Sequence, residues 1–587
     1  MTLPRRQFLR YLGIGTYAAL LNPLRLAAAA PRARTSAWTP SFFDPINPST
    51  ADQLGLPAGY RADLLGAWGD ELGFPDPIRN RELSFGNDND FLAYFPLASQ
   101  HDSLEKTVHD NTTLRGQHEP SLTEQGLLWV NHEWPHPLFV SGYSREDAQA
   151  EKPKTVEQIQ AEKRSVGGSV LYLRREADGR WRREYHHRYT RRYTACGPRF
   201  GFDGPAAEAV ASLSGQPDCP GTLANCSGGA TPWHSVLSCE ENYHFYNPQT
   251  PRTLRWSDQP DEAIAETQFG WVVEVDPFGE LPPVKHTSLG RFSHENIALR
   301  CDGPTGRLVA YMGDDKADEC VYKFVSAQPL PASASRLEQR AALSQGTLYA
   351  ADFQHGRWLA LDWNVQKNRE KWQAYNATAR QTGEPLITSQ ADILIHTRIA
   401  ARVLGATPLD RPEDCEIHPA DGSVYIALTN NTRRANFYGQ IVRLIEDNDN
   451  PEGERFRFEL FLLGGRHSGL ACPDNLAFDR RGNLWVACDI ASSRLGHDPY
   501  QAFGNNGLFM VPTTGPGAGQ AYQFASGPTD CELTGPWFSG NDRTLFLSVQ
   551  HPGGNSPSLE RLSSHWPHGG RELPRSGVVA ITGFERV

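Results

Sequence analysis

The sequence predicts an all-β protein, a six-bladed β-propeller with helical surface insertions, and two repeated patterns support this prediction. A short apolar strand that ends on polar residues occurs six times, at 126–133, 234–242, 306–315, 422–431, 482–489 and 543–553. A small polar cluster precedes five of these strands, at 225–229, 293–296, 411–419, 472–478 and 530–535. Each unit is typical of a β-hairpin with polar residues at one end.

Six such hairpins arranged radially bury the faces that one hairpin leaves open, and the ends of their inner strands meet at a central channel. A β-sandwich of repeated hairpins is the alternative. Polar strand ends in all six copies favour the propeller. The 53 glycines and 43 prolines agree with an architecture rich in turns.

The N-terminus is typical of an export signal. Residues 1–30 place the pair Arg5–Arg6 before a short apolar run at 11–21, and four alanines at 27–30 offer a cleavage site. This order predicts a twin-arginine signal, recognition by the twin-arginine translocation machinery, and a periplasmic or secreted protein.

The rest of the chain is predicted to form an N-terminal arm at 31–60 and a single β-propeller catalytic domain at 61–587. The charged stretch 146–164 is predicted to be a helical surface insertion. The formal net charge of −11 and pI near 6.0 argue against a nucleic-acid binder, which needs a basic surface. The apolar run at 11–21 is too short for a stable membrane span, no other segment looks transmembrane, and we expect a monomer.

Acidic residues stand at most of the repeated polar positions. In a propeller they would converge on one region: Glu133, Glu240, Glu241, Glu295, Asp314, Asp315, Glu413, Asp474, Asp489 and Glu532. So many carboxylates repel one another unless they take up protons or bind cations. Oxygen-rich clusters suit Ca²⁺, so the set predicts a metal site, although any one of these acids alone is more often a turn residue or a cap.

Cys226, in the stretch 225–242, adds a soft thiolate that suggests a transition metal beside calcium. From spacing alone, a metal ligand, a disulfide partner and an inert thiol all stay open for it. The ten cysteines form no C-x-x-C pair.

Linked motifs over nearly the whole chain resemble the PhoX-type alkaline phosphatases, which are exported bacterial enzymes. The motifs are FGNDNDF (85–91), VNHEW (130–134), GTLANCSGGATPW (221–233), LSCEEN (237–242), SLGRFSHE (288–295), VAYMGDD (309–315), VYKFV (321–325), TRIAARVLGATPLDRPED (397–414), ALTNN (427–431), PDNLAFDRRGNLWVACD (473–489), CELTG (531–535) and QHPGG (550–554).

The resemblance implies a six-bladed propeller whose channel holds a mixed cluster of Fe³⁺ and Ca²⁺, in which a cysteine bridges two ferric ions and an oxo group links iron to calcium. It implies hydrolysis of small phosphate monoesters in phosphate acquisition. By motif, the implied metal ligands are Cys226, Glu133, Glu241, Glu295, Glu413, Asp474, Asp489 and Glu532. Arg411 is the implied phosphate contact, and Arg411, Cys226 and Glu413 are the expected catalytic residues.

A phosphate ester is repelled by an acidic channel unless cations outweigh the carboxylates, and Arg411 can add a bidentate clamp. Arg192 and Arg291 are further candidate phosphate contacts, as are Lys323 and Arg398, although a structural ion pair is the commoner role for each. A metal-bound oxygen is a nucleophile in its own right, which agrees with the lack of a G-x-S-x-G motif.

Four departures from the family's motifs stand out. N-C-A-G-G is NCSGG here, D-R-P-E-W is DRPED, P-D-G is PDN, and T-P-W-G-T is TPWHS. The last is expected to place His234 and Ser235 near the cluster, and Asp414 and Asn475 are expected to alter substrate access or the metal complement.

Two other functions stay open. PDNLAFDRRGNLWVACD is also similar to a motif of calcium-dependent propeller lactonases, which need neither Cys226 nor Arg411. A calcium-stabilised propeller without catalysis predicts bound calcium, no iron and no turnover.

Overall fold

The computed structural model describes residues 39–584 apart from 75–82, 98–123, 248–250, 252, 257–264 and 331–332, so the predicted export signal lies outside the described residues. The described chain is mostly β and forms six sheets of four or five strands. The strands pair antiparallel except in one sheet, where a short edge strand runs parallel to its neighbour.

The first strand of each sheet packs on the first strands of two other sheets, so that six strands form a closed ring in the order β2, β8, β12, β17, β21, β25 and back to β2. We call these six the ring strands. From the ring strand outward, the first sheet is β2 (Asn89–Pro96), β3 (Gln125–His132), β4 (Gly167–Arg175) and β5 (Trp181–Glu184), and β6 (Arg191–Tyr193) also pairs with β4. The second is β8 (Asn225–Ala230), β9 (Val236–Glu240), β10 (Val272–Val275), β11 (Val284–His286) and β7 (Gly201–Asp203). The third is β12 (Ala298–Arg300), β13 (Arg307–Gly313), β14 (Val321–Pro329), β15 (Gly346–Asp352) and β16 (Arg357–Ala360). The fourth is β17 (Pro412–Ile417), β18 (Val424–Leu428), β19 (Gln440–Glu446) and β20 (Phe456–Leu463). The fifth is β21 (Pro473–Phe478), β22 (Leu484–Cys488), β23 (Gly507–Val511) and β24 (Tyr522–Ser526). The sixth is β25 (Glu532–Phe538), β26 (Thr544–Gln550), β27 (Gly577–Thr582) and β1 (Arg61–Ala67).

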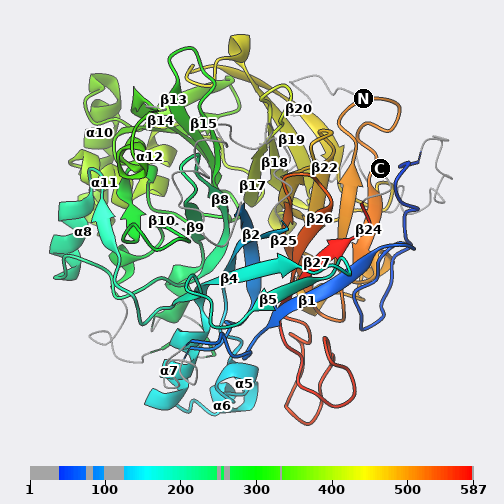
Figure 1. Ribbon diagram of the computed structural model, residues 1–587. Coiled ribbons are helices and arrows are strands. Elements are labelled where there is room, and N and C mark those ends of the chain that lie inside the picture. The colour runs from blue at the N-terminus through cyan, green and yellow to red at the C-terminus, as the bar shows by residue number, and fades with distance from the viewer. Residues whose placement is uncertain are drawn as a thin grey trace.

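The predicted hairpins are confirmed. The six repeated apolar strands of the sequence are β3, β9, β13, β18, β22 and β26, the second strand of each sheet, and each pairs with a ring strand. Their residues are almost all buried, since each lies inside a sheet that is covered on both faces. Figure 1 shows β2, β8, β17 and β25 near the middle of the molecule, with helices toward its edge.

The first and last strands of the described chain meet in one sheet, because β1 pairs with β27. Ahead of β1, the arm lies along β24: the Ile46 N–H donates to the Gln523 carbonyl at 3.0 Å, and Gly55 bridges Ser526. Phe43 is buried against Trp485 at a ring-centroid distance of 6.3 Å. The arm therefore covers the outer strand of the fifth sheet.

Helices occur in the connections: α5 (Pro137–Val140), α6 (Arg145–Gln149), α7 (Val156–Ser165), α8 (Ala207–Ser214), α9 (Arg336–Arg340), α10 (Gln366–Thr382), α11 (Gln390–Ile395) and α12 (Thr397–Leu404). The predicted helical insertion at 146–164 is confirmed as α6 and α7. Both begin with a capping box, in which Ser144 and Thr155 accept from the backbone three residues later. Among the described residues, no helix is both long and apolar enough to cross a membrane.

Large apolar side chains fill the spaces between neighbouring sheets. Trp129, Trp233, Trp271 and Trp485 are almost completely buried there, and burying a large apolar side chain stabilises a fold by about 1.5–3 kcal/mol. All ten cysteines lie within the described residues and all are free thiols. The disulfide interpretation of Cys226 is therefore wrong.

Candidate active site

Each ring strand has one polar residue at an equivalent position near its N-terminal end. In five of them the approach to the strand contains a non-glycine residue with φ between 47° and 64°, namely Asp88, Ala224, Arg411, Cys472 and Asp530. Two residues later lie Asp90, Cys226, Glu413, Asp474 and Glu532. At the sixth strand Glu295 takes this place, directly after the bridge between His294 and Asp314. We call these six residues the inner layer.

A repeated irregularity of the backbone directs the inner layer. In β2, β8, β17 and β21 the pairing register shifts right after the first paired residue, for example between Asn225 and Gly228. Such a bulge leaves a residue outside the ladder and re-aims its side chain. A left-handed non-glycine residue costs about 1 kcal/mol or more, so its recurrence at five ring strands indicates a functional constraint.

The ends of the second strands form an outer layer above the inner one: Glu133, Glu241, Asp315, Thr429, Asp489 and His551. The first five each donate the backbone N–H to the carbonyl of a residue that precedes the neighbouring ring strand, at 2.9–3.1 Å. The two layers thus share one hydrogen-bonding pattern across five sheets.

Seven of these side chains lie close enough to share cations. Three overlapping groups have ligand atoms within 4.8 Å of one another: Asp90, Glu133 and Cys226; Cys226, Glu241 and Glu295; and Glu295, Glu413 and Asp474. All seven are buried. The Cys226 Sγ lies 3.7 Å from the Asp90 Oδ2, so the thiol belongs to the carboxylate cluster.

The cluster is electrostatically costly without positive charge. Burial, reinforced by neighbouring carboxylates, raises the pKa of Asp90, Glu241, Glu295, Glu413, Asp474 and Glu532 well above ordinary values. Burial and the charges of Asp90 and Glu133 likewise raise the pKa of the Cys226 thiol. These groups ionise together only where cations compensate them.

Two oxygen atoms show that the residues fit cations. The Asp90 Oδ1 and the Glu295 Oε2 are buried and accept no hydrogen bond within the described structure, although a buried carboxylate oxygen normally has a partner. Other oxygens of the cluster are held by neutral donors: Gln550 donates to Asp90 at 2.9 Å and to Glu133 at 2.8 Å, and Asn242 donates to Glu241 at 2.7 Å. Orienting partners of this kind are typical of metal ligands.

Arg411 lies at the edge of the cluster. Its guanidinium donates to both carboxylate oxygens of Asp315, at 2.8 and 2.7 Å, and pairs with Glu413 at 2.8 Å and Asp489 at 3.1 Å. Although burial opposes it, this pairing lowers the pKa of Asp315. The Arg411 side chain is 26% exposed, so a ligand can reach it from solvent.

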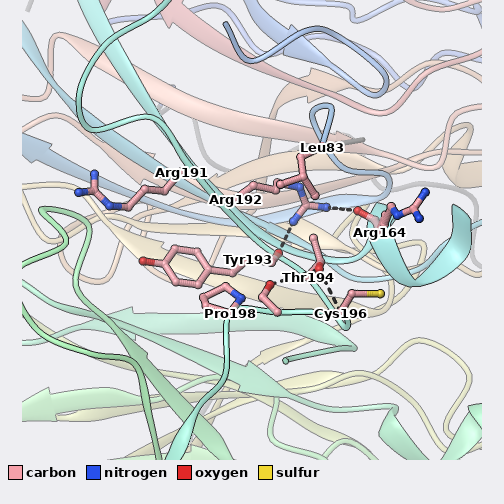
Figure 2. Close-up of a pocket in the computed structure, with 9 residues that line it drawn as sticks. Leu83, Arg164, Arg191, Arg192, Tyr193, Thr194, Cys196 and Pro198 are labelled. Carbon is pink, nitrogen blue, oxygen red and sulfur yellow. Dashed lines mark hydrogen bonds between the residues drawn. The ribbon is translucent and has the colours of Figure 1, made fainter. Parts of the chain in front are cut away.

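The other predicted phosphate contacts are engaged elsewhere. Arg192 donates to the carbonyls of Ser84, Gly168 and Arg164 at 2.9–3.2 Å and lines a cavity of about 520 Å³ that no cluster residue lines. Figure 2 shows its guanidinium directed at backbone carbonyls, with Arg164 and Arg191 pointing to opposite sides. Arg291 donates to the carbonyls of Phe269 and Glu266.

Several predicted channel residues face the sheets instead. Glu240 pairs with Lys285 at 2.6 Å because adjacent residues of a strand point to opposite faces, so only Glu241 reaches the cluster. Asp314 pairs with Arg398 in the same way, and Lys323 pairs with Glu446 at 3.0 Å. The expectation that Glu240 and Asp314 join the cluster is wrong, whereas the ion-pair roles of Arg398 and Lys323 are confirmed.

His234 and Ser235 are not near the cluster. In the hairpin of β8 and β9, Asn225 pairs with Glu240 and Ala230 with Val236. The turn that contains His234 therefore lies at the opposite end from Cys226, about 17 Å away along the strand at 3.3 Å per residue. The prediction from the TPWHS departure is wrong because the hairpin register carries this turn away.

With this geometry established, comparisons with known proteins identify the family. The family model "Alkaline phosphatase PhoX" matches residues 41–553. This chain belongs to the PhoX alkaline phosphatase family. It is similar to Pseudomonas fluorescens PhoX, solved in complex with vanadate, a transition-state analogue, with 30% identity, coverage of 92% of this chain and 97% of that chain, and a TM-score of 0.76.

More distant structures are similar at low scores. A Xanthomonas campestris gluconolactonase has 10% identity, coverage of 70% and 82%, and a TM-score of 0.27. A putative 6-phosphogluconolactonase from Bacteroides uniformis has 10% identity, coverage of 76% and 98%, and a TM-score of 0.27. No curated protein sequence matches. Membership in the PhoX family makes this chain a phosphatase, and the lactonase alternative is set aside.

Sequence reasoning missed two polar residues at the ends of the ring and second strands. Asp90 lies in the motif FGNDNDF and His551 in QHPGG, and neither was singled out as a ligand candidate. The signal was available, because Asp90 precedes the first hairpin as Glu413 and Asp474 precede theirs. His551 pairs with Glu532 at 3.0 Å through its Nε2, while its Nδ1 lies 3.0 Å from the Asp530 carbonyl oxygen.

Proposed function

We propose that this protein is an exported, metal-dependent alkaline phosphatase that hydrolyses small organic phosphate monoesters at an iron–calcium cluster in the channel of a six-bladed β-propeller. The observation that carries the proposal is the buried cluster of seven acidic and thiol side chains with Arg411 at its edge. An anion enters such a site only with cations present.

The propeller architecture is supported by the closed ring of six strands and by the shared sheet of β1 and β27. Strand ends that surround a common axis pool their side chains. That is how residues from Asp90 to Glu532 come to occupy one site.

The residues that would hold the cations are Cys226, Glu133, Glu241, Glu295, Glu413, Asp474, Asp489 and Glu532, with Asp90 added by the structure. The mixture of one thiol with many carboxylates suits a transition metal such as iron, which accepts thiolate and carboxylate ligands together, beside hard Ca²⁺. When bound, these cations supply the Lewis acidity that attracts phosphate oxygens and activates water.

The chain itself supplies orientation. Arg411 is held by Asp315, Glu413 and Asp489, which fixes its planar guanidinium at the rim. One Nη1 N–H is left for a phosphate oxygen, and a bidentate contact requires the phosphate to displace the Glu413 or Asp489 carboxylate. Export through the twin-arginine machinery is supported by the motif in residues 1–30 and by family membership.

Metal analysis and turnover of p-nitrophenyl phosphate test the proposal. We expect iron and calcium in the native protein, and we expect Cys226→Ala to lose iron and turnover together. Cys239→Ala is the matched control, because Cys239 is a buried free thiol of the same hairpin outside the cluster; it should keep both. An iron-free active protein, or activity untouched by Cys226→Ala, would overturn the cluster.

The phosphate clamp has a separate test. Arg411→Ala should lower kcat/KM by about 10²–10³-fold, the usual loss for one preorganised donor to a developing anion. Arg411→Lys should recover part of this, because it restores charge without the bidentate fork. Unchanged turnover in Arg411→Ala would remove the role while leaving the cluster intact. A protein with calcium, no iron and no turnover would be the non-catalytic, calcium-stabilised propeller.

A further inference from the structure

A row of polar side chains lies directly beneath the ligand layer, on residues that the proposed mechanism does not use. Ser227, Asp414 and Asn475 each follow an inner-layer residue and occupy the same place in β8, β17 and β21. All three are buried, with exposed fractions of 1–3%. They are also three of the positions at which this chain departs from the family's motifs.

Hydrogen bonds tie this row together across the ring. The Ser227 hydroxyl donates to the Asp414 Oδ1 at 3.1 Å, and the Leu476 N–H donates to the Asp414 Oδ2 at 2.7 Å. In the ring order, β8 and β21 lie on opposite sides. The Asp414 carboxylate therefore spans the channel and joins the bulge that carries Cys226 to the bulge that carries Asp474.

Neighbouring contacts show how the row orients the ligands above it. Asn475 donates to the Glu295 Oε1 at 3.2 Å and accepts from the Gly535 N–H at 2.8 Å. The Asn131 amide donates to the carbonyls of Cys226 and Ser227, at 2.7 and 3.0 Å. The peptides on both sides of Ser227, the first of which joins it to Cys226, are thus fixed by Asn131.

The charge of Asp414 reaches the ligand layer. Asp414 directly follows the ligand Glu413 in β17, and its Oδ1 lies 3.1 Å from the hydroxyl of Ser227, the residue after Cys226. A negative charge on Asp414 therefore acts on any cation that Cys226 and Glu413 bind.

We propose that Asp414 is a positioning residue of the metal centre: its carboxylate spans the channel floor, fixes the Cys226 bulge, and lies beneath the metal that Cys226 would bind. The proposal rests on the proposed function, since it requires iron bound by Cys226. A negative charge near an iron centre favours its higher oxidation state, so Asp414 lowers the Fe³⁺/Fe²⁺ reduction potential.

Three variants of the full-length protein, purified with native metals, test this inference. Asp414→Asn keeps the shape and removes the charge: the amide oxygen accepts from the Leu476 N–H, and the amide NH2 donates to the Ser227 hydroxyl oxygen, so that this contact reverses its direction. Ser227→Ala is the matched control, because it removes one of the same hydrogen bonds and keeps the charge. Asp414→Ala removes the charge and both bonds. The readouts are metal content, the urea midpoint of unfolding, and the iron reduction potential by redox titration, in which dithionite donates one electron per Fe³⁺ reduced.

We expect Asp414→Asn to retain iron and the urea midpoint and to shift the reduction potential to more positive values, with Ser227→Ala at the wild-type potential. Asp414→Ala should show the positive shift and a lower urea midpoint. An unchanged potential in an iron-loaded Asp414→Asn protein would overturn the inference while the proposed function stands. A wild-type protein without iron or turnover would overturn both. An equal shift in Ser227→Ala would replace the charge role by a purely structural one and also overturn it.

Discussion

Two sets of buried charges occupy this molecule, and they differ in how their charge is compensated. Inside the sheets, several buried acids have a cationic side chain beside them: Glu240 pairs with Lys285 at 2.6 Å, and Glu446 with Lys323 at 3.0 Å. At the ring, seven ligand groups within reach of one another share the single guanidinium of Arg411 among the contacts that the structure describes.

The difference distinguishes ion pairs that stabilise the fold from a cluster of groups that can bind cations. A buried acid with its own cation is complete in the folded chain, and removing either partner leaves an uncompensated charge. A buried cluster with too few cations is incomplete until ions from solution bind it. The comparison teaches that the sheets are stabilised by the chain's own charges, whereas the ring depends on its metal ligands.

Removing the bound cations is expected to have the largest effect. Any ion that binds only the folded state stabilises it by about 4 kcal/mol per site at a free concentration a thousandfold above Kd. Prolonged chelation should therefore lower the thermal midpoint of unfolding, and the loss should grow with pH. The sign follows from the cluster's raised pKa values: a group that binds protons more tightly in the folded state favours folding at low pH and loses that contribution as pH rises through its folded pKa.

Scanning calorimetry of metal-loaded and chelated protein at several pH values measures this loss. Glu295→Gln should reduce the difference between the thermal midpoints of metal-loaded and chelated protein, because it removes one of the carboxylates that repel one another. A thermal midpoint that chelation does not change at any pH would contradict the view that the ring, unlike the sheets, depends on bound cations for its stability.

Breaking one sheet pair is expected to cost about 3–5 kcal/mol, the usual penalty for leaving a buried charge without its partner. Lys285→Met should lower the free energy of unfolding, obtained from urea titration of metal-loaded protein, by that amount without changing the metal content. The double variant Lys285→Met, Glu240→Gln should recover most of it, since no charge stays buried. A single variant as stable as wild type would contradict the view that these pairs are self-contained.

A pH effect in the second sheet is expected to be somewhat smaller. His286 lies between Asp203 at 3.0 Å and Glu274 at 2.9 Å. Burial opposes protonation, but the two carboxylates raise the pKa of His286 to about 9, against about 6.5 in an unfolded chain.

Because the pKa of His286 is higher in the folded than in the unfolded chain, the protonated imidazole stabilises the fold fully below pH 6.5. This stabilisation is lost as pH rises toward 9. It amounts to about 3 kcal/mol. Urea unfolding at pH 6 and pH 9 measures it, with His286→Gln as the reference. The pH 6 to pH 9 difference in stability should shrink in that variant, and an identical pH profile would show that the imidazolium does not contribute.

Much of the fold and part of the site were predictable from the sequence. The hairpins were recognisable because buried strands with polar ends repeat six times, and Cys226, Glu413 and Asp474 were recognisable because each stands just ahead of such a strand. Glu240 was assigned to the wrong side because Glu240 and Glu241 are chemically alike, and only the pairing register decides which of two adjacent residues faces the ring. Asp90 was overlooked, although it stands ahead of the first hairpin as Glu413 and Asp474 stand ahead of theirs, because the polar cluster was recognised in only five of the six units.

The sequence by itself determined the kind of chemistry: a repeated hairpin, an excess of carboxylates at the strand ends, one thiol among them, and the motifs of a phosphatase family. Only the tertiary structure decided which groups meet. Residues as distant as Asp90 and Gln550 touch at 2.9 Å, and Asp414 joins strands on opposite sides of the ring. The physical reason is that composition and periodicity are local properties of the chain, whereas burial and electrostatic coupling depend on which residues the closed ring brings within a few ångströms.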